Sequence, residues 1–262
     1  MDLGLSKRVA LVCGASRGIG YAVAEELVRE GAQVAICARD ANSVAAAAAK
    51  LAPTGAKVLQ IVADLSTSDG TAAAVAKVLA EYGRVDVLVT NTGGPTPGPS
   101  LSHDWAAWTR AIELLLRSAV ELTRALVPGM QERKWGRVIG ITSIAVKKPV
   151  PSLVLSNSLR AAVTGYYRTL ADEVGIDGVT VNTVLPGYVA TERLEQLAEA
   201  AAKRTGATKE SIAESYKQGT PVGRVGAPAE IAAVVAFLAS ERASFVTGQA
   251  ILADGGRSGT LL

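Results

Sequence analysis

The chain has 262 residues, of which 49% are hydrophobic but only 4% aromatic, so it can bury a large core that is mainly aliphatic. Its 27 basic and 24 acidic residues give a net charge of +3 without a basic run interleaved with aromatic residues, which argues against a nucleic-acid partner. We find neither the order of segments of a signal peptide nor an apolar window of membrane-spanning length, and therefore expect a cytoplasmic protein without a membrane partner.

Residues 9–20 read as an apolar strand, a turn with three glycines and the start of a helix. Such a turn suits a pyrophosphate, because backbone N–H groups converge on the anion and the helix dipole favours its charge. The glycines are Gly14, Gly18 and Gly20, a spacing that departs from the G-x-G-x-x-G fingerprint. Alone, the pattern also fits a turn that only packs tightly.

Beyond this turn, short apolar runs alternate with longer amphipathic stretches. We predict strands at 8–13, 33–38, 57–63, 85–90, 137–142, 178–184 and 249–253. We predict helices near 19–30, 43–51, 69–81, 104–133, 153–174 and 228–239. Left-handed helix caps are expected at Gly31, Gly83, Gly136 and Gly178. The alternation predicts an α/β protein whose residues 1–262 form a single-domain, doubly wound Rossmann-like fold, with a seven-stranded parallel sheet covered by helices on both faces.

The segment 191–219 and the two cysteines do not follow from this alternation alone. Residues 191–219 interrupt the alternation with a polar helical pattern, which fits either a lid-like helical insertion or a plain surface insertion. Cys13 and Cys37 both fall in predicted buried strands and have no histidine neighbours, so we expect small core residues and no metal site.

Ordered motifs along nearly the whole chain carry a family resemblance. They are residues 14–20 (GASRGIG), 63–65 (ADL), 91–94 (NTGG), 141–143 (ITS), 181–182 (VN), 186–187 (PG) with Thr191, and 254–256 (DGG). In this order and at these separations the chain resembles the short-chain dehydrogenase/reductase family, in particular its 3-oxoacyl-carrier-protein reductase-like members.

The resemblance implies a cofactor pocket. The pyrophosphate turn would consist of Gly14, Ser16, Arg17, Gly18, Ile19 and Gly20. Asp64 would bind the adenine with Leu65 beside it, and Asn91 and Gly93 would lie near the adenosine ribose. Pro186, Gly187 and Thr191 would hold the nicotinamide, although Pro186 and Gly187 also fit an ordinary turn.

The choice of cofactor depends on the end of the second predicted strand. An acidic residue directly after this strand would favour NAD, but Ala38 and then Arg39 occupy the expected position. Arg17 and Arg39 can converge on a 2′-phosphate with charge-assisted hydrogen bonds. We therefore predict that NADP(H) is preferred, while a shift of one residue would bring Asp40 to the ribose and make NAD(H) possible.

The resemblance fails at the catalytic residues. The family uses Asn, Ser, Tyr and Lys, and only Ser143 matches its position. Ser156 stands where the tyrosine is expected, Arg160 four residues later replaces the lysine, and Leu115 replaces the asparagine. A serine hydroxyl is a weaker acid than a phenol and its side chain is shorter, so we predict an impaired active site in which Arg160 still holds the nicotinamide ribose.

Another acid can take the place of the lost phenol. Tyr188 follows the Pro186–Gly187 pair, and Lys147 and Lys148 lie on the loop after Ser143, which the family geometry puts over the pocket. Tyr188 paired with Lys148 is one candidate. Tyr188 also fits a pocket wall, and the lysines a solvated loop.

Two functions follow from this pattern. The first is an NAD(P)(H)-binding oxidoreductase, 3-oxoacyl reductase-like, that acts on a small carbonyl or alcohol substrate with a nonstandard active site. The second is a non-catalytic nucleotide-binding or scaffold protein derived from a reductase. The resemblance also implies a homotetramer, or a dimer, built from helices 104–133 and 153–174 and the segment after Gly248.

Overall fold

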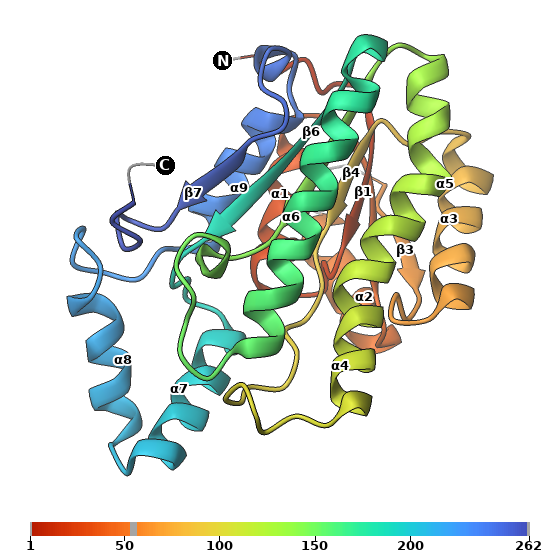
Figure 1. The fold of residues 1–262 in the computed structure, drawn as a ribbon. Helices are drawn as coiled ribbons and strands as arrows, with labels where there is room; N and C mark the ends of the chain where they lie inside the picture. Colours follow the sequence, from red (N-terminus) through yellow and green to blue (C-terminus); the bar gives the residue numbers. More distant parts are fainter. Residues whose placement is uncertain (1, 53–56, 261–262) are drawn as a thin grey trace.

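The computed structural model describes residues 2–52 and 57–260 and contains the predicted parallel sheet (Figure 1). Its strands are β1 (Val9–Cys13), β2 (Gln33–Ala38), β3 (Leu59–Val62), β4 (Val87–Thr90), β5 (Gly136–Ile141), β6 (Val179–Pro186) and β7 (Ala250–Ala253). They form one seven-stranded sheet in the order β3-β2-β1-β4-β5-β6-β7, and every pair is parallel. The prediction of a doubly wound sheet is therefore confirmed.

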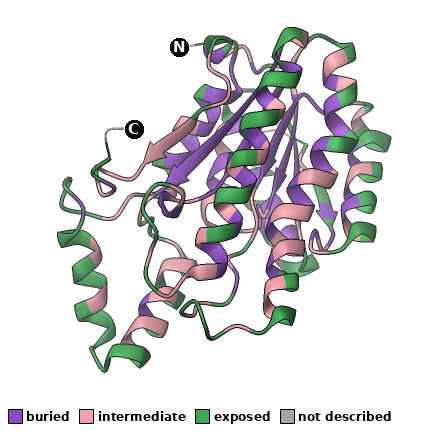
Figure 2. Cartoon of the chain, viewed as in Figure 1, coloured by how far each residue is buried: buried purple, intermediate pink, exposed green. Residues whose placement is uncertain are grey.

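Helices cover both faces of this sheet (Figure 1). The α-helices are α1 (Gly18–Arg29), α2 (Ala41–Leu51), α3 (Ser68–Tyr82), α4 (Trp105–Ile112), α5 (Ser118–Glu132), α6 (Val154–Val174), α7 (Glu192–Thr205), α8 (Lys209–Gln218) and α9 (Pro228–Ala239). One core cluster joins α1, α2 and α9 to the sheet, and a second joins α3, α5 and α6 to its opposite face. The central strands are buried on both sides for this reason (Figure 2), which explains why they read as continuous apolar runs.

The sheet reverses its winding direction between β1 and β4. Strand β1 pairs with β2 on one side and with β4 on the other, and chain order then runs outward in both directions. In such sheets the loops at the carboxyl ends of the two central strands part and leave a crevice. The topology therefore fixes where a ligand can bind before any side chain is considered.

The predicted glycine caps are correct at three of four positions. Left-handed backbone is found at Gly31, Gly83 and Gly178. Gly136 is wrong: it is the first residue of β5, and Lys134 adopts the left-handed conformation before it. Glycine is needed at 136 for space, because an added Cβ would lie 2.7 Å from the sulfur of Met130.

The predicted helix over 104–133 is interrupted. Between α4 and α5 the chain forms a π-helical turn, η2 (Glu113–Arg117), and Leu115 lies at its centre. A π-turn accommodates an extra residue without ending the helix, so apolar periodicity does not reveal it. Residues 191–219 form α7 and α8, which agrees with the helical pattern predicted there.

Cys13 and Cys37 are neighbours across β1 and β2, where both are buried and free. Burial raises the pKa of Cys37 to about 12 and that of Cys13 well above its ordinary value. Both thiols therefore behave as small core residues. Among the described residues no cluster of His, Cys, Asp or Glu is arranged to hold a metal ion, and no helix there is both long and apolar enough to cross a membrane.

Candidate functional site

A cavity of about 1520 Å³ opens at the carboxyl edge of the sheet. Residues just after five strands contribute to its wall: Gly14, Asp64, Asn91, Ser143 and Gly187. Helices α7 and α8 contribute the outer part of the wall. The residues predicted to bind the cofactor all line this cavity except Gly20, and so do Ser143, Ser156, Arg160 and Tyr188. Leu115, Lys147 and Lys148 do not.

The glycine turn after β1 has the close packing that a pyrophosphate site requires. Gly14 has a φ of +59°, and a Cβ added to Gly20 would lie 2.3 Å from the Gly14 carbonyl oxygen. Asn91 fixes the turn from β4, since its Nδ2 donates to the same oxygen at 3.2 Å. Gly20 therefore shapes the turn from behind and does not face the cavity.

Helix α1 begins at this turn, and Gly18 and Ile19 of its first turn line the cavity. Its N-cap residue, Arg17, makes no side-chain capping bond. Helices α2, α3, α7 and α8 are capped by an Asp or Thr side chain. An anion can satisfy the free donors and the helix dipole together, so these residues fit a dinucleotide pyrophosphate.

Asp64 and Arg39 define the adenosine end of the cavity. Asp64 Oδ1 accepts from the backbone N–H of Ser66 at 2.9 Å and from its hydroxyl at 2.8 Å. Burial raises the pKa of Asp64, but the bonds from Ser66 and the charge of Arg39 outweigh burial, so the pKa lies below its ordinary value. Leu65 is buried beside it. A fixed carboxylate and an exposed guanidinium thus face the expected adenosine position.

Asp40, the acid that competes with Arg39 for the cofactor, is engaged in the local fold. Its Oδ1 caps α2 by accepting from the Ser43 N–H at 2.7 Å and from the Ser43 hydroxyl at 2.5 Å. Arg17 is engaged on the other side, since its guanidinium pairs with Glu192 of α7. Both members of that pair are largely exposed, and exposed ion pairs are weak, so a phosphate can compete for Arg17.

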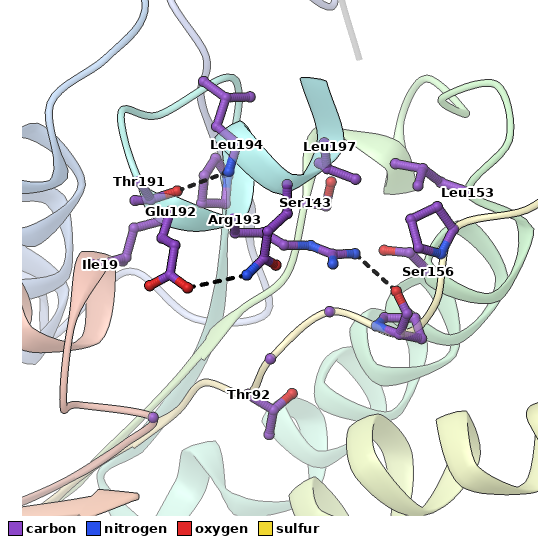
Figure 3. Close-up of a pocket in the computed structure, with 18 of the residues that line it drawn as sticks. Ile19, Thr92, Ser143, Leu153, Ser156, Thr191, Glu192, Arg193, Leu194 and Leu197 are labelled. Atoms are coloured by element: carbon purple, nitrogen blue, oxygen red, sulfur yellow. Dashed lines mark hydrogen bonds between the residues drawn. The ribbon is translucent and has the colours of Figure 1, made fainter. Parts of the chain in front are cut away.

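The opposite wall follows β6, which ends at Pro186. The Gly187 N–H donates to the Ala253 carbonyl at 3.1 Å, and a Cβ added to Gly187 would lie 2.7 Å from Asp254 Cα. The turn is therefore held against the end of β7. Thr191 caps α7 with its hydroxyl (Figure 3), and Gly93 faces the cavity from the loop after β4.

Ser156 and Arg160 lie one turn apart on α6 and are bonded to each other. Arg160 Nε donates to Ser156 Oγ at 3.1 Å, and its Nη1 donates to the carbonyl oxygens of Ile141 and Thr142, both at 2.9 Å. Burial and then the charge of Arg193 lower the pKa of Arg160 to about 10. The guanidinium stays charged at neutral pH and is fixed to the end of β5.

Ser143 and Leu115 complete the predicted catalytic group. Ser143 lines the cavity, and its Oγ accepts from the Ala145 N–H at 3.1 Å. Leu115 is buried among Ala111, Leu155 and Leu159. It also lines a second cavity of about 20 Å³ behind Arg160. An apolar side chain therefore stands where the resemblance implies an asparagine amide.

Tyr188 lies in the cavity wall, where Tyr216 and Arg257 hold its ring. Its ring centroid is 4.1 Å from that of Tyr216 in α8, and the Arg257 guanidinium lies 3.9 Å above it. Arg257 Nη2 also donates to the Tyr188 hydroxyl at 3.0 Å. Lys147 and Lys148 are exposed and are not among the residues that line the cavity, which fits the alternative of a solvated loop, while the later part of the same loop, residues 150–153, does line it.

Arg193 is a site residue that sequence reasoning missed. It extends from the start of α7 toward Ser156 (Figure 3), packs over Gly94, and donates from Nη2 to the Pro95 carbonyl at 2.8 Å. A signal was present in the sequence, since a cation two residues after the helix cap Thr191 opposes the helix dipole. A residue in this unfavourable position usually has another reason to be there.

The fold and this cavity define a dinucleotide-binding Rossmann-like protein. A family model described as enoyl-(acyl carrier protein) reductase matches residues 14–258, and the chain belongs to the short-chain dehydrogenase/reductase family. The chain is 34% identical over 249 residues to the short-chain reductase protein NovJ of Streptomyces niveus, covering 95% of this chain and 93% of NovJ. It is 32% identical over 253 residues to the 3-oxoacyl-[acyl-carrier-protein] reductase FabG of Chlamydia muridarum, covering 96% and 98%.

Solved structures give the same family. L-sorbose reductase from Gluconobacter frateurii, complexed with NADPH and L-sorbose, superposes with a TM-score of 0.94 at 35% identity over the whole of both chains. An actinorhodin polyketide ketoreductase with NADPH gives a TM-score of 0.93 at 31% identity, covering 97% of this chain and 98% of the other.

Proposed function

We propose that the protein is an NADP(H)-dependent oxidoreductase that acts on a small carbonyl or alcohol substrate through a rebuilt proton-transfer site. The closely packed glycine turn and the uncapped start of α1 support dinucleotide binding. Arg39, together with an Asp40 carboxylate that is engaged in capping α2, supports a preference for the 2′-phosphate. The NADPH-bound relatives support the same cofactor.

The cofactor supplies the hydride when it is bound, and the chain's own residues position the other reactant. We assign Ser143 to the substrate oxygen, because its hydroxyl lies in the cavity wall after β5. Arg160 provides a fixed positive charge for the nicotinamide ribose, with Pro186, Gly187 and Thr191 along the same wall. Positioning alone supports hydride transfer, since it brings the two reactants together.

One observation carries the altered chemistry: the Ser156 hydroxyl bonded to the Arg160 guanidinium. A serine has a far higher pKa than a phenol, and a neighbouring guanidinium does not release a proton near neutral pH. Leu115 adds no polar group to relay a proton. Because a positioned general acid typically contributes a factor of about 10² to 10⁴, we expect reduction of ordinary ketones to be slower by a similar factor.

The same observation supports a second candidate, a non-catalytic nucleotide-binding or scaffold protein. NADPH oxidation across a panel of aldehydes and ketones separates the two when it is measured beside thermal stabilisation by NADPH. Slow oxidation that is lost in Ser143→Ala supports the enzyme, whereas stabilisation without oxidation supports the binding protein. A lack of stabilisation by NADPH and NADH alike refutes both.

The proton source is tested in the same assay. If Tyr188 replaces the lost phenol, Tyr188→Phe abolishes the remaining oxidation. If Tyr188 only anchors α8 through Tyr216 and Arg257, the variant retains its maximal rate. Assembly as a homotetramer or a dimer stays a prediction that light scattering tests.

A further inference from the structure

Arg160 and Arg193 bring two positive charges to the substrate side of the cavity, the part of its wall beside Ser143 and Ser156. The two side chains meet at Ser156: Arg160 Nε donates to its hydroxyl at 3.1 Å, and Arg193 reaches toward it from α7 (Figure 3). In keeping with this, burial lowers the pKa of both guanidinium groups, and the charge of Arg193 lowers that of Arg160 further. In the described part of the chain no carboxylate forms an ion pair with either one. Two like charges held together in a partly buried wall repel each other, and an anion between them would relieve that repulsion.

Both guanidinium groups keep unused donors. Arg160 bonds through Nε and Nη1, which leaves Nη2 without an acceptor among residues 2–52 and 57–260. Arg193 bonds only through Nη2, to Pro95, so its Nε and Nη1 have no acceptor in the same ranges. The bonds already formed fix both side chains in place, and a carboxylate or phosphate accepts such donors with charge-assisted hydrogen bonds.

The acids that line the cavity are engaged elsewhere. Asp40 caps α2 and Asp64 is bonded to Ser66, both toward the adenosine end. Glu192 precedes Arg193 in the chain but pairs with Arg17 beside the glycine turn. Among the described residues of the wall, no acid therefore neutralises the positive charge on the substrate side.

We infer that the substrate carries an anionic group, a carboxylate or phosphate close to its carbonyl, and that Arg193 binds this group with Arg160 beside it. The inference rests on the proposed function, because it names the class of substrate for the same site. Arg193 acts here as a specificity residue. A neutral ketone of the same size leaves both charges uncompensated and binds more weakly.

Titration calorimetry with matched ligands tests this inference without turnover. The protein is titrated, with and without saturating NADP⁺, with 2-oxobutanoate against its neutral methyl ester, and with dihydroxyacetone phosphate against dihydroxyacetone. We expect one of the two anions to bind at least about tenfold more tightly than its neutral partner, and this comparison separates carboxylate from phosphate. Arg193→Gln should lose most of that difference, Arg193→Lys part of it, and the control Lys203→Gln none of it, since exposed Lys203 lies on α7 outside the cavity wall.

Three results overturn the inference: equal binding of anionic and neutral ligands, no loss in Arg193→Gln, or an equal loss of NADP⁺ affinity in that variant. Failure of the proposed function looks different. If anions bind through Arg193 but neither NADPH nor NADH binds, the oxidoreductase proposal is refuted and the anion site stands. If neutral ketones are reduced without any preference for anions, only the inference falls.

Discussion

The choice of cofactor depends on two adjacent residues with opposite charges, and the structure separates their roles. Arg39 forms no hydrogen bond with the described residues and faces the cavity, so its guanidinium is free to bind a phosphate. Asp40 is bonded twice to Ser43 as the cap of α2, and these bonds lower the pKa of its carboxyl. We therefore expect Arg39 to bind the 2′-phosphate and Asp40 to serve only the helix.

Arg39→Ala removes one charge-assisted contact, which is worth about 1.5–3 kcal/mol. NADPH affinity should therefore fall by a factor of about 10 to 150, while NADH affinity stays within about twofold. Asp40→Asn keeps a capping side chain but removes the charge, so it should leave NADH affinity unchanged and NADPH affinity equal or higher. Asp40→Ala removes the cap and should lower the melting temperature by on the order of 2 °C.

Fluorescence titration with NADPH and NADH measures these affinities, and thermal unfolding measures the effect of the cap. NADH binding that is weaker by tenfold or more in Asp40→Asn would contradict a role for Asp40 in the helix cap alone, because the carboxylate would then bind the ribose. An equal loss of affinity for NADPH and NADH in Arg39→Ala would contradict binding of the 2′-phosphate by Arg39. A fall in melting temperature in Arg39→Ala would show that the side chain supports the fold instead.

Two further predictions concern the residues at the expected catalytic positions and the buried pair of Thr90 and Tyr167. The combined change Leu115→Asn, Ser156→Tyr and Arg160→Lys should raise the rate of ketone reduction at least tenfold. No single change should do so, because the phenol of the introduced tyrosine needs both the lysine and the asparagine. Unchanged steady-state rates would show that the cavity has been reshaped around the present residues. Tyr167→Phe should lower the free energy of unfolding by about 1–3 kcal/mol, because the buried Thr90 hydroxyl, which lies 2.7 Å from the Tyr167 hydroxyl, would lose its partner. Denaturant unfolding that matches the parent protein would contradict this.

The sheet could be predicted from the sequence because both of its faces are covered. Strands buried on two sides read as apolar runs, and helices between them fix the parallel order. The predictions that failed concern local backbone geometry. The π-turn at 113–117 leaves the apolar periodicity intact, and Gly136 is a glycine because Met130 crowds it, which is a tertiary contact that spacing does not contain.

The site residues, too, include some that the sequence predicts and some that it does not. Positions tied to backbone geometry, such as Gly14 and Pro186, follow from motifs. The directions of long side chains do not follow from motifs: Arg17 pairs with Glu192 of α7, and Lys148 is exposed. The sequence did not predict Arg193 as a site residue, because its place in the cavity wall with Arg160 arises only when the chain folds.

Helices α7 and α8 contribute little to the buried core, since α8 buries no residue and α7 buries only Ala198. Their amide hydrogens should exchange with solvent through local opening long before those of β5, which must await global unfolding. Substitutions in these two helices can therefore accumulate at small thermodynamic cost. The residues of α7 and α8 that line the cavity can therefore change in evolution, and with them the molecules that enter it, while the glycine turn after β1 stays the same.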